Sequence, residues 1–233
     1  MINESNQKSA EFSDSPCNAE ARARISLGSS NERIYQLVSS TIRGLHRERG
    51  TLVDVGCGTG ELRRYISDAI DIYIGSDIVR YDGLPAEVVF KPVNLDTGSV
   101  DLPDGEADVV ACVETIEHVE NPRALFRELS RLARPGGLIV VTTPNQLSLL
   151  NKLCFALKDQ FAAFQEGPGL YPSHISALLP VDLVRMAQEN HLVDFAISYP
   201  GGGRIPGTAR HWPRRLNGKS YSDNVLLSAR KSR

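Results

Sequence analysis

Short apolar runs alternate with amphipathic segments over most of the chain. Residues 52–55, 72–77, 88–93, 107–113 and 138–142 are each short enough to be a buried strand. Residues 62–70 and 122–132 instead carry apolar side chains at helical spacing, and they lie between such runs. Strands that alternate with helices predict an α/β fold with a parallel sheet and right-handed crossovers.

Capping residues mark the start of two predicted helices. Ser29, with Glu32 three residues later, is a candidate capping box in front of apolar positions at helical spacing between residues 34 and 45. Asn121 and Pro122 predict the N-cap and the first turn of the helix at residues 122–132. The segment between Asp77 and the next strand is too short for a full crossover helix, so we expect a loop or a single turn there.

The regular alternation ends after residue 144. Residues 145–179 contain an amphipathic stretch, 149–164, and a Gly/Pro-rich loop with His174, which makes them a candidate lid or acceptor-binding insertion. Pro180 opens a further helix, and residues 192–199 and 224–229 are predicted to be the last two strands.

The first 28 residues lack any periodicity. They are rich in Ser, Asn, Glu and Ala, so residues 1–28 are predicted to be a flexible N-terminal tail. No composition shift divides the rest, and we expect one domain over residues 29–233.

Composition and charge exclude several classes of protein. Hydrophobic residues make up 41% and charged residues 23% of the 233, which is typical of a globular protein. A formal net charge of −2 gives no overall field that attracts nucleic acid or an anionic membrane surface. The four cysteines, Cys17, Cys57, Cys112 and Cys154, are scattered, so neither a zinc finger nor a disulfide framework is indicated. Without a signal peptide or a transmembrane run, a cytoplasmic location is expected.

The segment TLVDVGCGTGEL, residues 51–62, is the strongest chemical signal. Gly56, Gly58 and Gly60 leave no side chain over a strand-to-helix turn, so that a ligand can lie against the backbone near a helix N-terminus. A dinucleotide fingerprint has glycine at its first, third and sixth positions. Glu61 occupies the sixth position here, and its carboxylate would repel a diphosphate.

Five motifs in a fixed order carry a family resemblance. VDVGCGTG, GSDI, NLD with LPDGEADVV, ETIEHV and RPGGLIVVTTPN resemble the class I S-adenosylmethionine-dependent methyltransferases over residues 50–145, and more weakly over the C-terminal strands. The E-x-x-E-H segment is similar to that of the ubiquinone-pathway O-methyltransferase branch. The resemblance implies a Rossmann-like, doubly wound sheet of about seven strands with the last strand antiparallel, and S-adenosylmethionine as the cofactor.

The resemblance also implies a set of cofactor contacts. The methionine end would meet the glycine turn, where amide donors suit its carboxylate, and Asp77 would accept hydrogen bonds from the ribose hydroxyls. Asp96 would contact the adenine. The full set is Asp54, Gly56, Cys57, Gly58, Gly60, Asp77, Ile78, Leu95, Asp96, Thr97, Val113 and Glu114. Each of these contacts has a purely structural alternative: the glycine segment can be only a tight turn, Asp77 only an N-cap and Asp96 only part of a surface turn.

His118 is the candidate general base, because a hydroxyl acceptor must lose a proton and imidazole titrates near neutral pH. A histidine that only packs at the strand's end is the alternative. Glu114, Glu117, His118 and His174 are candidate metal ligands, since similar E-x-x-E-H segments bind metal in small-RNA 2′-O-methyltransferases and some ubiquinone-pathway enzymes. A divalent metal is the less favoured expectation, because the second histidine cluster of the RNA enzymes is missing.

The acceptor is expected to be a small molecule or a saccharide, methylated on oxygen. An NAD-linked oxidoreductase and a non-catalytic cofactor-binding protein of the same fold are the alternatives. The apolar residues of 149–171 can belong to the core, line an acceptor pocket, form a homodimer interface or touch a membrane surface. The basic residues between 201 and 220 are either a solvated loop or a site for an anionic acceptor.

Overall fold

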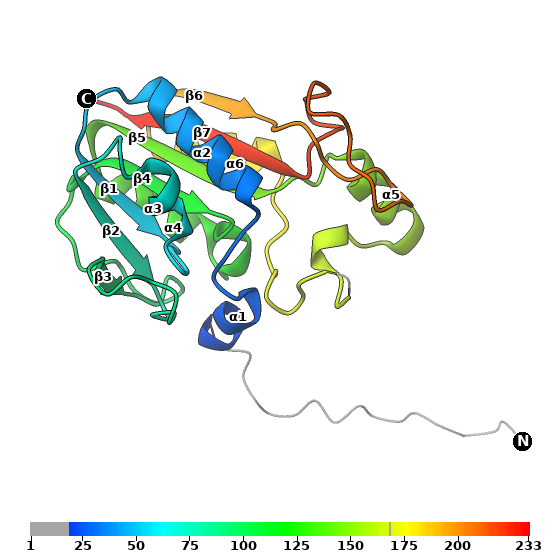
Figure 1. Cartoon of the computed structure of the whole chain (residues 1–233), viewed down its shortest axis with the longest axis horizontal. Helices are drawn as coiled ribbons and strands as arrows, with labels where there is room; N and C mark the ends of the chain where they lie inside the picture. The colour runs from blue at the N-terminus through cyan, green and yellow to red at the C-terminus, as the bar shows by residue number, and fades with distance from the viewer. Residues whose placement is uncertain (1–18, 168) are drawn as a thin grey trace, which may run out of the picture.

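A single seven-stranded sheet organises the chain (Figure 1). The computed structural model describes residues 19–167 and 169–233. The strands follow the order β3-β2-β1-β4-β5-β7-β6, and β7 is antiparallel to both of its neighbours. They are β1 Thr51–Val55, β2 Ile72–Asp77, β3 Val89–Pro92, β4 Ala107–Val113, β5 Ala133–Pro144, β6 Leu192–Ser198 and β7 Asn224–Lys231. The predicted fold class and its antiparallel last strand are confirmed.

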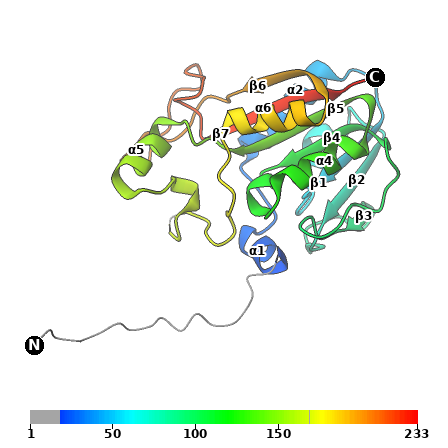
Figure 2. The same cartoon turned by 180° about the vertical axis from the view of Figure 1, so that it is seen from behind.

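Helices cover both faces of the sheet. α2 and α3 lie on one face and α4 and α6 on the other, as the two opposite views show (Figures 1 and 2). Each face has its own apolar core of buried residues. The helices are α1 Ala19–Ser26, α2 Glu32–Leu45, α3 Glu61–Ile66, α4 Pro122–Leu132, α5 Leu149–Lys158 and α6 Pro180–Glu189, with 3-10 turns η1 Ile116–His118 and η2 Ala162–Phe164. None of the described helices has the length and apolarity that a bilayer span needs.

Local signals explain most element boundaries, with one exception among the caps. The Asn121 side chain accepts a hydrogen bond from Ala124 N (3.0 Å), so the predicted cap of α4 is confirmed. α2 is capped by Asn31, whose side chain accepts from Arg33 N (2.9 Å), and not by the predicted Ser29–Glu32 box. Asn31 stands directly before the first helical residue and is an equally strong capping residue.

Residues 19–26 form α1, where the sequence predicts an irregular tail; residues 1–18 of that tail lie outside the described residues. α1 has no strong amphipathic pattern. It is held instead by polar contacts with distant segments, and Arg22 is its buried residue. Its intrahelical pair, Glu20 and Arg24 (2.7 Å), has the i, i+4 spacing that supports helix formation.

Parallel packing brings the ends of β1, β2 and β4 to one edge of the sheet. The turn after β1 packs so closely that side chains are excluded: Gly58 has a φ of +52°, and a Cβ there would overlap the carbonyl oxygen of Gly28. No helix follows β2 before β3, as the short segment predicts. The acidic residues that end or follow β2 and β4, Asp77 and Glu114, therefore meet at this edge.

A buried acid lies within the sheet itself. Asp54 on β1 is 2% exposed, and its Oδ2 accepts a hydrogen bond from the Tyr73 hydroxyl on β2 (2.5 Å). Its Oδ1 has no hydrogen-bond partner. Burial raises the pKa of Asp54 to about 7.

This acid makes stability depend on pH. The pKa of Asp54 is higher in the folded than in the unfolded state, so its contribution to the free energy of unfolding is fully present at low pH. This contribution is lost as pH rises from about 4 to about 7, and the loss is at most about 4 kcal/mol. We predict that Asp54→Asn, which keeps an acceptor for Tyr73, reduces this loss. Urea unfolding of both proteins at about pH 5 and about pH 8 measures it; equal losses in the two proteins would contradict the assignment.

Candidate functional site

A cavity of about 170 Å³ opens at the edge where β1, β2 and β4 end. α1 and the linker after it close one side of this cavity, and residues of the 145–179 insertion contribute to another. Its walls are Ala19, Ala23, Ser26, Gly28, Ser29, Ser30, Tyr35, Gly56, Asp77, Ile78, Tyr81, Val93, Asn94, Leu95, Asp96, Val113, Glu114, Thr115, His118, Val119, Leu170 and His174.

The charge of the cavity wall has one sign. Asp77, Asp96 and Glu114 line it, and no lysine or arginine is among its described lining residues. Aliphatic side chains such as Ile78 and Leu95 also line the cavity. A site of this kind favours a ligand that carries positive charge, hydroxyl groups and a flat apolar part, and it disfavours a diphosphate.

The amides of the glycine turn donate to the protein itself. Gly56 N donates to Ser76 O (2.7 Å), Gly58 N to Asp77 Oδ2 (2.9 Å) and Gly60 N to Cys57 O (2.8 Å). Each of the three amides thus has an acceptor within the protein, and the expectation that they hold the cofactor's carboxylate stays a prediction. The turn also shapes the cavity: of its three glycines, Gly56 is the one that lines it.

Asp77 is fixed by the backbone around it. Its Oδ2 accepts from Gly58 N, and its Oδ1 accepts from Ile78 N (2.7 Å). Burial raises the pKa of Asp77 above its ordinary value, although these amides lower it. Each carboxylate oxygen has a second lone pair, so Asp77 can still accept hydrogen bonds from a diol in the cavity.

Asp96 is paired with a residue that the sequence does not single out. Arg22 of α1 forms a buried ion pair with Asp96 Oδ2, and both side chains are less than a tenth exposed. Arg22 Nε also donates to the carbonyl oxygen of His118 (3.1 Å), and Asp96 Oδ1 accepts from Glu120 N (2.8 Å). Arg22 therefore ties α1 to both the predicted adenine-side acid and the predicted base.

Glu114 is held in an uncommon backbone conformation. Its φ is +50°, which costs energy for a residue with a side chain and persists at functional sites when the surroundings enforce it. Thr142 Oγ1 accepts from its amide (3.0 Å), and Asn224 Nδ2 donates to its Oε2 (2.7 Å). Its Oε1 is buried without a partner. Burial raises the pKa of Glu114.

His118 has a defined tautomer. The Ser173 hydroxyl donates its proton to the carbonyl oxygen of Arg22 (3.0 Å), so toward His118 Nδ1 (2.8 Å) its oxygen can only accept a hydrogen bond. The carbonyl oxygen of Ser173, which is also an acceptor, lies 2.9 Å from the same nitrogen. Nδ1 therefore carries the proton, and Nε2 keeps a lone pair. Burial lowers the pKa of His118, which keeps the ring neutral near pH 7.

Three of the four candidate metal ligands lie together. One ligand atom each from Glu117, His118 and His174 falls within 4.8 Å of the others, and Glu117 Oε1 lies 3.8 Å from His174 Nε2. Burial and the neighbouring His118 lower the pKa of His174 to about 4. Glu117 is fully buried and its Oε1 lacks a hydrogen-bond partner. One carboxylate and two neutral imidazoles form a donor set that fits a divalent cation.

Nine of the fifteen site residues that the sequence singles out line the cavity. Those outside its wall are Asp54, Cys57, Gly58, Gly60, Thr97 and Glu117; of these, Glu117 lies in the cluster with His118. Sequence reasoning missed residues of α1, the Ser26–Ser30 linker, Tyr35, Tyr81, Leu170 and Ser173. The Glu20–Arg24 spacing is the one local signal that could have indicated α1.

Comparisons with known proteins agree with this arrangement. Residues 30–194 match the family described as a methyltransferase domain. The chain is 34% identical over 105 residues to a ubiquinone biosynthesis O-methyltransferase of Methylococcus capsulatus, covering 40% of this chain and 43% of that protein. It is 26% identical over 211 residues to that of Colwellia psychrerythraea, covering 85% and 82%.

Solved structures extend the comparison to the fold. A SAM-dependent methyltransferase of Thermotoga maritima superposes with a TM-score of 0.62 and 18% identity, covering 91% of this chain and 92% of that one. At this identity the likeness concerns the fold alone.

The Arg22 contacts predict how α1 is retained. Arg22→Met removes the buried ion pair while it keeps an apolar stem, so α1 should detach and its amides should exchange at least tenfold faster. Hydrogen–deuterium exchange of residues 19–28 measures this. Arg24→Met is the matched control, because Arg24 is exposed and pairs with Glu20 on the same helix. Equal exchange in the two variants would show that Arg22 does not hold α1.

Proposed function

Because the chain belongs to the methyltransferase-domain family, whose model it matches over residues 30–194, we propose that it transfers the methyl group of S-adenosylmethionine to a hydroxyl oxygen of a small-molecule or saccharide acceptor. The observation that carries the proposal is the cavity wall of Asp77, Asp96 and Glu114 without a lysine or arginine among its described residues. This charge pattern suits a cationic nucleoside and opposes NAD, whose diphosphate would face these acids.

The residues of the cavity divide between the parts of the cofactor. Asp77 would accept from the ribose hydroxyls, and Ile78 and Leu95 offer an apolar surface for the adenine. The buried, unpartnered Oε1 of Glu114 would take the α-ammonium group, which supplies the donor that this oxygen lacks. Bound S-adenosylmethionine supplies an electrophilic methyl group on a positively charged sulfur.

His118 is the residue suited to remove the acceptor's proton. It lines the cavity, is neutral near pH 7 and keeps the lone pair of Nε2. Ser173 holds its Nδ1 proton and so orients the ring, as a carbonyl or hydroxyl partner commonly does for a catalytic histidine.

Alternatively, Glu117, His118 and His174 bind a divalent cation. It would lower the pKa of an acceptor hydroxyl and so replace His118 as the cause of deprotonation. Turnover that survives dialysis against EDTA supports the base; turnover that is lost and restored by Mn²⁺ or Zn²⁺ supports the cation.

Methyl transfer itself can be tested with methyl-deuterated S-adenosylmethionine and a panel of phenols, catechols and sugars. Mass spectrometry should find one labelled methyl group on the oxygen of an acceptor. Label on nitrogen or carbon, with none on oxygen, would contradict the assignment of the acceptor atom.

Cofactor binding should depend on Asp77. We expect Asp77→Ala to bind S-adenosylmethionine about a hundredfold more weakly, because two charge-assisted hydrogen bonds are lost. Asp82→Ala is the control, since Asp82 is exposed on the loop that follows β2. Isothermal titration calorimetry compares the variants, and an unchanged affinity in Asp77→Ala would remove Asp77 from the cofactor site.

The proposed base predicts a separation of binding from turnover. His118→Gln should lower kcat by about 10²–10⁴ while the affinity for S-adenosylmethionine changes little. Single-turnover measurements with the identified acceptor give the rate. A variant with wild-type turnover would show that His118 only packs at the end of β4.

A further inference from the structure

The insertion presents an unusual amount of apolar surface to solvent. α5 exposes Leu153 by 42%, Phe155 by 51% and Leu157 by 81%, and the following loop exposes Leu170 and Tyr171 by 43% and 48%. Leu153 and Leu157 lie one turn apart and so share a face of the helix. All five belong to the insertion, whose parts are joined by the stacked rings of Phe155 and Phe161 (5.2 Å) and by the hydrogen bond from Leu170 N to Ala163 O (3.1 Å). We call these five side chains the apolar tip.

A loop rich in basic residues lies against the start of α5. Residues 201–220, the basic loop, carry Arg204, Arg210, Arg214, Arg215 and Lys219, all of them exposed, and no acid. Arg204 pairs with Asp223 (3.1 Å), and no ion pair of the other four is found among the described residues. Lys152 and Lys158 on α5 add to this charge. Because the whole chain has a formal net charge of −2, positive charge is concentrated here.

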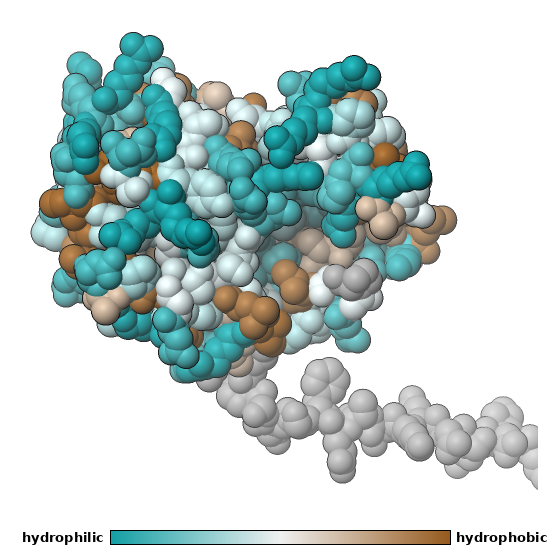
Figure 3. Space-filling view, viewed as in Figure 1, coloured by the Kyte–Doolittle hydropathy of each residue, from teal (hydrophilic) through white to brown (hydrophobic). Residues whose placement is uncertain are grey.

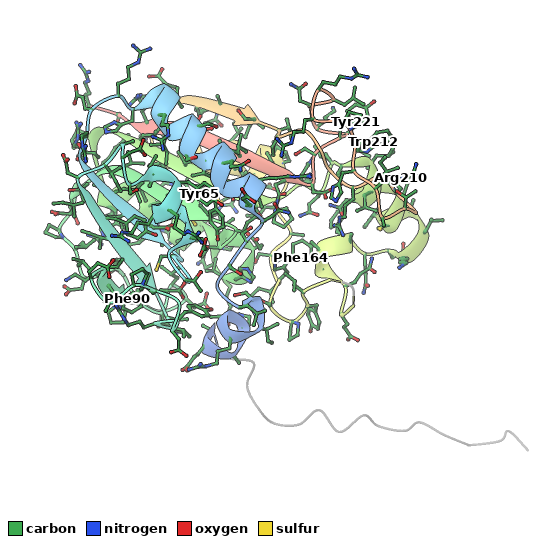
Figure 4. All side chains as sticks on the ribbon, in the orientation of Figure 1. Tyr65, Phe90, Phe164, Arg210, Trp212 and Tyr221 are labelled. Carbon is green, nitrogen blue, oxygen red and sulfur yellow. The ribbon has the colours of Figure 1, made fainter. Side chains whose placement is uncertain are left out.

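The basic loop and the apolar tip belong to one lobe. Leu149 N at the start of α5 donates to Ser220 O (2.9 Å), and Asn145 Nδ2 donates to Lys219 O (2.7 Å). Both cartoon views place the loop beside α5 at one end of the molecule (Figures 1 and 2). Arg210 is labelled in the loop beside α5 (Figure 4), and the same lobe shows hydrophilic and hydrophobic residues side by side on its surface (Figure 3).

We propose that this lobe binds the surface of an anionic lipid bilayer. Aliphatic and aromatic side chains at its tip would enter the headgroup region, and the arginines and lysines of the lobe would meet the lipid phosphates. The charge favours an anionic surface over a second copy of this chain, because two basic loops would repel each other.

The surface is continuous with the cavity. Leu170 belongs to the apolar tip and also lines the cavity, and the adjoining segment is fastened to η1 through Ile175 N and Glu117 O (2.9 Å). Docking would therefore bring the cavity's rim to the bilayer. If the proposed methyl transfer holds, an acceptor dissolved in the bilayer can reach His118 along this side.

Co-sedimentation with vesicles tests the proposal. The full chain should sediment with vesicles of equal parts phosphatidylcholine and phosphatidylglycerol, should not sediment with pure phosphatidylcholine, and should be released by salt. Arg214→Glu with Arg215→Glu, and separately Leu153→Ser with Leu157→Ser, should each weaken binding roughly tenfold or more. The matched control is Leu45→Ser with Arg47→Glu, an exposed apolar and basic pair at the C-terminal end of α2, which should bind as the wild type does.

Three results would overturn the proposal. They are no binding to the anionic vesicles, equal binding by all variants, and a Leu153- and Leu157-dependent dimer in analytical ultracentrifugation without vesicle binding. S-adenosylmethionine binding is measured on the same samples by calorimetry. A protein that binds the cofactor but no vesicles contradicts the docking surface and leaves the proposed function intact.

Discussion

The concentration of buried negative charge at one edge of the sheet is the constraint on which the site depends. Asp77, Asp96 and Glu114 reach the same cavity because parallel strands end there. Arg22 neutralises Asp96, whereas Asp77 and Glu114 have no ion pair among the described residues. Each acid is supported differently: Asp77 by backbone amides, Asp96 by Arg22 and Glu114 by Asn224. The Oε1 of Glu114 remains without a donor from the protein, and this is the atom to which the proposed function assigns the ammonium group of the cofactor.

Two segments outside the alternating core give this cavity its cover. α1 is fastened by Arg22 to Asp96 and to the backbone of His118, while Ser173 of the insertion fixes the His118 ring and also donates to the Arg22 carbonyl oxygen. Arg22, His118 and Ser173 thus connect α1, the turn after β4 and the insertion in one polar network. Such a network couples the orientation of the His118 ring to the position of α1, because moving α1 would disturb the hydrogen bond between Arg22 and Ser173, the residue that orients His118.

The sequence predicts what depends on neighbours along the chain. Strand and helix positions, the Asn121 cap, the missing helix after β2 and the places of Asp77 and His118 follow from periodicity, capping residues and motif order. Contacts between distant segments were out of reach: Arg22 and Asp96 are 74 residues apart, and Ser173 and His118 are 55 apart. The acceptors of two glycine amides were out of reach for the same reason, since Ser76 and Asp77 belong to the next strand.

Ligand selectivity by charge is the central claim, and calorimetric titration of the unmodified chain with S-adenosylmethionine and with NAD⁺ under the same conditions tests it most directly. The acids of the cavity predict that S-adenosylmethionine binds at least about tenfold more tightly, a difference of about 1.4 kcal/mol or more. Equal affinities, or tighter binding of NAD⁺, would contradict the account.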